Sequence, residues 1–152
     1  MEKFVQVLEM PKVPPELVRM ALLCIRAPAL QKRIAQEDGS FGFISLWDAQ
    51  IPSLRLWLEQ NIAPVMWHLS YFSRDMYAHK DPRTKTRMIY ILEPGGENVV
   101  TRFYDEDKET LLSTELLATE EWSIMNANRY HDISGIEEGK FRYALTARIQ
   151  SR

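Results

Sequence analysis

Several residue types and patterns that define other classes of protein are scarce in this chain of 152 residues. Cys24 is the single cysteine, so the chain forms no internal disulfide and is not a disulfide-stapled scaffold. No stretch approaches the run of about 20 apolar residues that a membrane-spanning helix needs. Neither sign of charge dominates, since 19 basic residues face 21 acidic ones for a net charge of −2. This balance gives no general reason to expect a nucleic acid or an anionic membrane as partner.

Common catalytic motifs are also absent. The sequence has no Gly-rich phosphate loop, no Gly-x-Ser-x-Gly elbow and no Cys-x-x-Cys pair, and we find no internal repeat. The first residues lack the apolar run of a secretory signal, so we expect a protein of the reducing cytoplasm. Cys24 lies in the apolar stretch 22–25, where a buried, unreactive thiol is expected.

The chain changes texture near residue 62, and we predict a single domain, 1–152, with two parts. Apolar residues at helical spacing, interrupted by prolines, indicate a helical N-terminal layer over 1–61, with Ser53 as the cap of its last helix. Residues 62–152 contain short β-like runs separated by turns. The strands that we expect are 65–72, 77–81, 87–92, 99–104, 122–126, 130–133 and 140–149. Helices followed by many antiparallel strands predict a mainly β fold, a jelly roll with the helices packed on one sheet.

The last of these runs shows the clearest alternation. Phe141, Tyr143 and Leu145 share one face with further apolar residues, whereas Arg142 and Thr146 share the other. We expect the apolar face to pack against the helical layer. The opposite face is then available to line a polar cavity.

Three residues could form a metal site in such a fold. His79 and Asp81 are two apart, so on a strand they project to one face, with backbones about 6–7 Å apart. His131 lies on a later strand that a jelly roll can fold back beside the first. Two His and one carboxylate suit Fe(II) and leave positions open for other ligands. Considered alone, His79 and Asp81 are better explained by an exposed loop that turns at Asp81-Pro82; His131 and Arg142 together favour the metal site.

Other polar residues could complete the site or be unrelated to it. Arg142 could bind a carboxylate through its planar guanidinium, or lie on the surface. Tyr71 could offer a hydroxyl to the same carboxylate, or be a core aromatic. We interpret His68 as a strand histidine with satisfied hydrogen bonds. Arg87 and Arg102 lie on strands whose facing the pattern does not fix, so either could meet an anionic substrate or be solvated.

Taken together, the C-terminal half resembles the Fe(II)/2-oxoglutarate-dependent dioxygenases, near the prolyl-hydroxylase-like and small phage or bacterial members. The resemblance rests on the order and spacing of the following pieces: Tyr71, His79-Lys80-Asp81, residues 87–92, residues 100–104, residues 122–126, Tyr130-His131-Asp132-Ile133 and Arg142-Tyr143-Ala144-Leu145. That family has a double-stranded β-helix, a cupin-like jelly roll. The helices before residue 62 add only general similarity.

The resemblance implies an oxygenase that uses Fe(II), 2-oxoglutarate and O2. By it, His79, Asp81 and His131 are the iron ligands, Arg142 binds the distal carboxylate of 2-oxoglutarate, and Tyr71 assists. The expected reaction hydroxylates a C–H bond of a peptide or a small molecule and releases succinate and CO2. The hard chemistry belongs to the metal and the cosubstrate, while the protein orients the reactants.

Two departures from the family pattern and two alternatives remain. Ala144 stands where the family often has a Ser or Thr, and the segment between Tyr71 and His79 lacks the usual Gly. The chain could instead be a cupin-like binding module, although it lacks the closely spaced His-x-His and the following Glu of cupin metal sites. It could also be a degenerate oxygenase without turnover. The sequence does not indicate the substrate or the oligomeric state.

Overall fold

Two antiparallel sheets form the body of the protein in the computed structural model, which describes residues 2–63, 66–81 and 85–148. The helices are α1 (Pro15–Ile25), α2 (Pro28–Ile34) and α3 (Pro52–Asn61). The strands are β1 (Val5–Leu8), β2 (Phe41–Ser45), β3 (Met66–Phe72), β4 (Met76–His79), β5 (Thr86–Glu93), β6 (Val100–Tyr104), β7 (Leu111–Glu115), β8 (Trp122–Asn126), β9 (Tyr130–Ser134) and β10 (Arg142–Arg148). The predicted jelly roll is confirmed.

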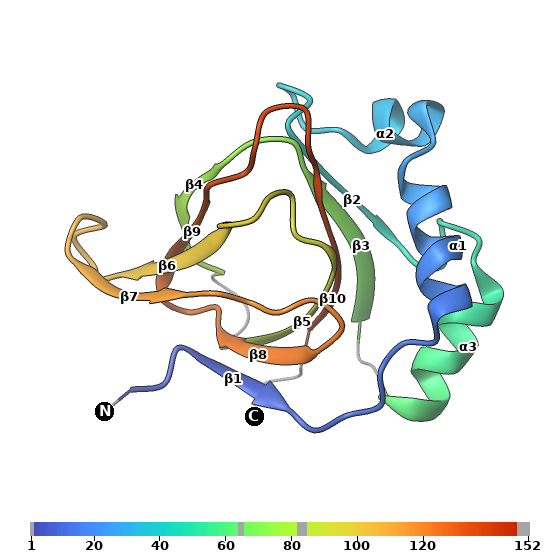
Figure 1. Ribbon diagram of the computed structural model, residues 1–152, viewed down its shortest axis with the longest axis horizontal. Coiled ribbons are helices and arrows are strands. Elements are labelled where there is room, and N and C mark those ends of the chain that lie inside the picture. The colour runs from blue at the N-terminus through green and yellow to red at the C-terminus, as the bar shows by residue number, and fades with distance from the viewer. Residues whose placement is uncertain (1, 64–65, 82–84, 149–152) are drawn as a thin grey trace.

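The sheets differ in size and face each other across the interior (Figure 1). The larger one has six strands in the order β1-β8-β5-β10-β3-β2, and the smaller one has four in the order β4-β9-β6-β7. From β3 to β6, and again from β7 to β10, consecutive strands of the chain alternate between the two sheets, as they do in a jelly roll. Strands that are distant in sequence, such as β4 and β9, therefore become neighbours.

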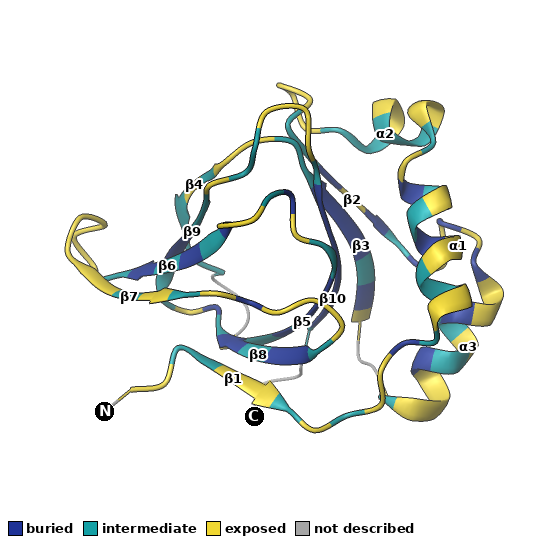
Figure 2. Cartoon of the chain, viewed as in Figure 1, coloured by how far each residue is buried: buried dark blue, intermediate teal, exposed yellow. Residues whose placement is uncertain are grey.

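All three helices cover one side of the larger sheet (Figure 1). The main hydrophobic core lies between them and contains Ile25 of α1, Leu58 of α3, Leu69 of β3 and Leu145 of β10, each fully buried. Figure 2 shows buried residues of α1 and α3 on the side that faces the sheet and exposed ones on the outer side. The expectation that the apolar face of the last strand packs against the helical layer is confirmed.

Residues 1–61, expected to be helical, also contribute β1 and β2 to the two edges of the larger sheet. A third strand that the sequence did not predict, β7, lies at an edge of the smaller sheet. The predicted cap of the last helix is wrong as well. That helix begins at Pro52, with Ile51 as N-cap and no side-chain capping bond, and Ser53 lies inside it. Proline fits the first helical position because its missing N–H is not needed there.

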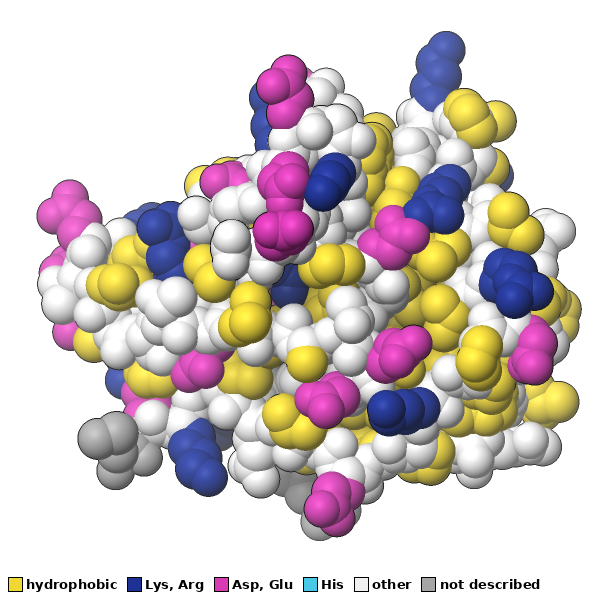
Figure 3. Space-filling model, viewed as in Figure 1, with side chains coloured by type: hydrophobic (Ala, Val, Ile, Leu, Met, Phe, Trp, Pro, Cys, Tyr) yellow, Lys and Arg dark blue, Asp and Glu magenta, His cyan; other side chains and the backbone are white. Residues whose placement is uncertain are grey.

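The surface carries no concentration of one charge on the face shown in Figure 3, where basic and acidic side chains intermingle. Cys24 is half-buried, not fully buried as expected, and burial raises the pKa of its thiol. None of the described helices has the length and hydropathy required to traverse a membrane.

Candidate functional site

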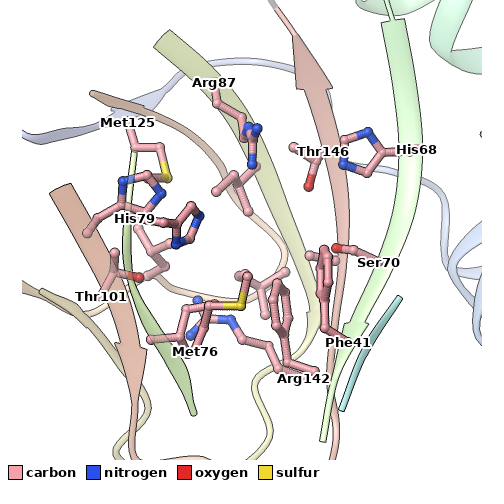
Figure 4. Close-up of a pocket in the computed structure, with 17 residues that line it drawn as sticks. Phe41, His68, Ser70, Met76, His79, Arg87, Thr101, Met125, Arg142 and Thr146 are labelled. Atoms are coloured by element: carbon pink, nitrogen blue, oxygen red, sulfur yellow. The ribbon is translucent and has the colours of Figure 1, made fainter. Parts of the chain in front are cut away.

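A cavity of about 80 Å³ lies between the two sheets, with space for several water molecules or a small ligand. The larger sheet contributes alternate residues of two paired strands, since successive side chains of a strand point to opposite faces. These residues are His68, Ser70 and Phe72 of β3 and Arg142, Ala144 and Thr146 of β10. The facing wall includes Met76, His79, Thr101, His131 and Ile133. The polar face predicted for the last strand therefore does line a cavity (Figure 4).

Two of the predicted iron ligands meet in this cavity. His79 of β4 lies directly opposite His131 of β9, and the centres of their rings are 4.4 Å apart. The register of β4 shifts between Met76 and His79, which indicates a β-bulge. A bulge changes the direction of the side chains that follow it. It allows Met76 and His79, three residues apart, both to face the cavity.

Backbone carbonyls fix the orientation of both imidazoles. The Nδ1 atom of His79 is 3.1 Å from the carbonyl oxygen of Tyr77, and that of His131 is 2.7 Å from the carbonyl oxygen of Arg129. Because a carbonyl oxygen only accepts, each Nδ1 carries the proton, and Nε2 of the neutral ring keeps its lone pair. Metal-binding histidines commonly have such a partner on their second nitrogen. Burial, and then the neighbouring His79, lower the pKa of His131 to about 4 and keep it neutral near pH 7.

Asp81 does not join the two histidines in this structure. Strand β4 ends at His79, not at residue 81 as predicted, and the backbone N–H of Asp81 donates to the carbonyl oxygen of Ala127 at 2.8 Å. The Asp81 carboxylate accepts a hydrogen bond from Arg87, and both side chains are 18% exposed. Across residues 2–63, 66–81 and 85–148, no group of three or more His, Cys, Asp or Glu is arranged to hold a metal ion. The structure therefore brings together two of the three predicted ligands and places the third beside them, paired with Arg87.

Arg142, at the start of β10, is buried at one end of the cavity (Figure 4). Its side chain has no ion pair within the described part of the chain, and its Nη1 atom has no hydrogen-bond partner there. Burial lowers the pKa of this guanidinium to about 10. A buried, unpaired cation is costly in a folded protein. This group is therefore suited to an anionic ligand that enters the cavity.

Gly95 makes room for the backbone of Arg142. A Cβ at this position would lie 3.0 Å from the nitrogen of Arg142, and its φ of +85° is in the region that favours glycine. Gly95 follows β5, which pairs with β10 up to Tyr143 and Glu93. The turn after β5 thus helps to position the guanidinium.

Tyr71 does not reach the cavity. It lies on the face of β3 that packs against the helices, where its hydroxyl donates to the carbonyl oxygen of Gln31 at 3.3 Å. Its predicted role as a helper of Arg142 does not agree with this position, because adjacent residues of a strand face opposite ways. Ser70 faces the cavity instead, directly across from Ala144. Alternation with His68 could have identified Ser70 from the sequence.

The remaining candidates separate clearly. His68 lines the cavity, and burial followed by the charges of Arg87 and Arg148 lowers its pKa to about 4. Arg87 also faces the cavity, whereas Arg102 forms a two-point contact with Asp132 at 3.0 and 2.8 Å. The structure thus gives each arginine a facing that the sequence pattern did not fix: Arg87 faces the cavity and Arg102 pairs with Asp132.

The donor set suits a chelated metal and a carboxylate. Two imidazoles with available Nε2 atoms and a nearby carboxylate are ligands that Fe(II) accepts. The guanidinium of Arg142, unpartnered at Nη1, suits an acid group held at a distance from them. The wall between these groups is largely apolar, with Phe72, Met76 and Ile133 among its residues. Such a wall limits the access of water.

Sequence comparison finds no matching family model and no matching curated protein. Structure comparison finds an oxidoreductase of the 2OG-Fe(II) oxygenase family from Burkholderia pseudomallei, with a TM-score of 0.53, 9% identity, and coverage of 86% of this chain and 75% of that one. A Pseudomonas putida prolyl-4-hydroxylase gives 0.55 and 16% identity over 92% and 89% of the two chains. The non-heme alpha-ketoglutarate-dependent carbocyclase SnoK from nogalamycin biosynthesis gives 0.59 and 12% identity over 90% and 76%. The chain therefore has the fold of the 2-oxoglutarate-dependent oxygenases.

Proposed function

We propose that the protein is an Fe(II)- and 2-oxoglutarate-dependent oxygenase that hydroxylates a C–H bond of a peptide or small molecule and releases succinate and CO2. The observation that carries this proposal is the buried guanidinium of Arg142, unpartnered at Nη1, at one end of the cavity that holds His79 and His131. A structural arginine would be expected to have its donors satisfied. The shared fold supports the same assignment.

In this proposal His79, His131 and Asp81 hold the iron. The fixed Nδ1 protons leave the Nε2 atoms of both histidines as ligands, and Asp81 contributes its carboxylate by exchanging Arg87 for the metal. Bound together, Fe(II) and the keto acid supply the oxygen-activating chemistry. The protein supplies position and a cavity with restricted access to water.

Arg142 binds the distal carboxylate of 2-oxoglutarate. A guanidinium forms two parallel hydrogen bonds with a carboxylate, which fixes the orientation of the ligand as well as its position. Ser70, across from Ala144 on the neighbouring strand, provides a hydroxyl on the same wall. We propose that this hydroxyl compensates for the Ser or Thr that is absent at position 144.

The contact between Asp81 and Arg87 favours one competing function, a degenerate oxygenase that no longer binds iron. If that ion pair is permanent, only two ligands remain. The same experiment separates this alternative from the active enzyme, because it monitors formation of the metal complex directly.

The test is anaerobic addition of Fe(II) and 2-oxoglutarate to the purified protein, with detection of the visible charge-transfer band of an iron-chelated keto acid. We expect a band that His131→Ala abolishes. His68→Ala is the matched control, since it removes another buried cavity histidine and should leave the band in place. Arg142→Ala should weaken keto acid binding at least tenfold. Folded wild-type protein without any band would overturn the proposal.

A further inference from the structure

Two further arginines lie toward the other end of β10 from Arg142: Arg87, which lines the cavity, and Arg148, its cross-strand neighbour. Arg148 lies directly across from Arg87, and Thr146 lies directly across from His68 on the other side of β10. Figure 4 shows Arg87, Thr146 and His68 at one end and Arg142 at the other. Nothing in the proposed chemistry of iron and 2-oxoglutarate requires a pair of arginines here.

The positive charge of this group is not balanced. The carboxylate of Asp81 contacts one nitrogen of Arg87, but the buried Nε atoms of Arg87 and Arg148 both lack a hydrogen-bond partner. Arg148 forms no ion pair within the described residues. The segments outside the described residues contain no Asp or Glu, so by sequence they add no acidic side chain. Binding of Asp81 to a metal would remove the carboxylate that contacts Arg87 among the described residues.

The two cationic groups begin from well-separated points of the sheet. Arg142 and Arg148 are six residues apart on one extended strand, a separation of about 20 Å at about 3.3 Å per residue. A five-carbon dicarboxylate is much shorter than this backbone separation. Arg87 contacts Asp81, so the second group adjoins the predicted metal ligands on the side away from Arg142.

We propose that Arg148 and Arg87 bind an anionic group, a carboxylate or a phosphate, of the substrate that is oxidised. Guanidinium groups bind both anions through paired hydrogen bonds. Ile89 and Met125 line the adjoining wall, so the part of the substrate beside the anion is apolar. The identification of the bound molecule as the substrate rests on the proposed oxygenase function. The presence of an anion-binding site does not depend on that function.

Titration of metal-free protein with inorganic phosphate, and separately with acetate, tests the site. Two-dimensional proton–nitrogen NMR spectra report the arginine Nε–H groups directly. We expect at least one of the anions to shift the signals of Arg148 and Arg87 in a saturable way. The titration is repeated in Arg142→Gln, where the cosubstrate site cannot contribute, and the dissociation constant should change less than twofold.

Arg148→Gln should weaken binding of that anion at least tenfold, because only the guanidinium of Arg87 then remains to donate charged hydrogen bonds to it. Arg33→Gln, which removes an exposed arginine of α2, is the matched control and should leave the constant unchanged. If Arg148→Gln fails to fold, Arg148→Lys replaces it, with binding at least threefold weaker because an ammonium cannot form the paired bonds.

The proposed anion site would be overturned if neither anion shifts the NMR signals of Arg148 and Arg87. It would also be overturned if the Arg148 variant binds the anion with wild-type affinity. The titration uses neither iron nor keto acid. Failure of the oxygenase assignment would therefore leave its result intact, and failure of the anion site would leave the charge-transfer band intact.

Discussion

Replacement of Arg142 by Met should make the ligand-free protein more stable. Arg142 is 3% exposed, and burial lowers the pKa of its guanidinium well below its ordinary value, to about 10. At about 1.4 kcal/mol for each pKa unit, holding this charge in the cavity costs about 3 kcal/mol. The depressed pKa of a cation means that the fold disfavours its charged form. Removal of the charge should therefore recover part of that energy.

We expect a net gain of about 1–2 kcal/mol, since methionine has a similar length but loses some of the contacts of the arginine. For a chain of this size, that gain corresponds to a rise in Tm of about 2–8 °C. Urea unfolding of the metal-free protein near pH 7 measures the free energy directly.

The same substitution should abolish stabilisation by 2-oxoglutarate in the presence of Fe(II) under anaerobic conditions. A ligand at 100 times its Kd stabilises the folded state by about 2.7 kcal/mol, and the variant should show almost none of this effect. Arg102→Met is the contrasting control. It breaks a paired contact with Asp132, whose side chain is 9% exposed, and should destabilise the protein by about 1–3 kcal/mol. Ligand-free Arg142→Met protein that is less stable than wild type by more than about 1 kcal/mol would refute the reasoning.

Three further outcomes follow from the structure. Gly95→Ala should lower the free energy of unfolding by more than about 1 kcal/mol and weaken keto acid binding. Both the φ of +85° at this position and the nearby backbone of Arg142 oppose a Cβ. Unchanged keto acid binding in a titration would contradict this. Lowering the pH from 7 to 5 should reduce the free energy of unfolding by about 2 kcal/mol for each of His68 and His131. Their pKa of about 4 in the folded protein lies below the value of 6.5 in the unfolded chain, so the unfolded chain takes up protons first. His68→Gln should roughly halve that slope in urea unfolding. Leu145→Ala should lower the free energy of unfolding by about 2–5 kcal/mol in the same assay, since Leu145 is fully buried against the helical layer. A loss below about 1 kcal/mol would contradict this and show that neighbouring residues fill the cavity.

The strands that sequence alternation predicted are those whose two faces differ in chemistry. The last strand is the best example, because Tyr143 and Leu145 pack against helices while Arg142 and Thr146 face the cavity. The strands that the sequence did not predict, β1, β2 and β7, all lie at sheet edges. Edge strands of four or five residues depend on a distant partner, so their local pattern is weak.

The position of the site residues depended on features that residue spacing does not encode. A bulge in β4 turns His79 toward His131, and the strand ends before Asp81, which leaves that carboxylate to pair with Arg87. Spacing alone suggested that His79 and Asp81 would share a strand face. Tyr71 and Ser70 are adjacent, and only the side on which the helices pack determines which of them faces the cavity.

The sequence by itself determined the class of fold and the groups available for chemistry. Its run of β-like segments after residue 62 led to the jelly roll, and its three histidines limited the choice of metal ligands. Only the tertiary structure decided which polar groups are buried without partners. Desolvation depends on contacts between strands far apart in the chain, and it is what distinguishes Arg142, Arg87 and Arg148 from ordinary surface arginines.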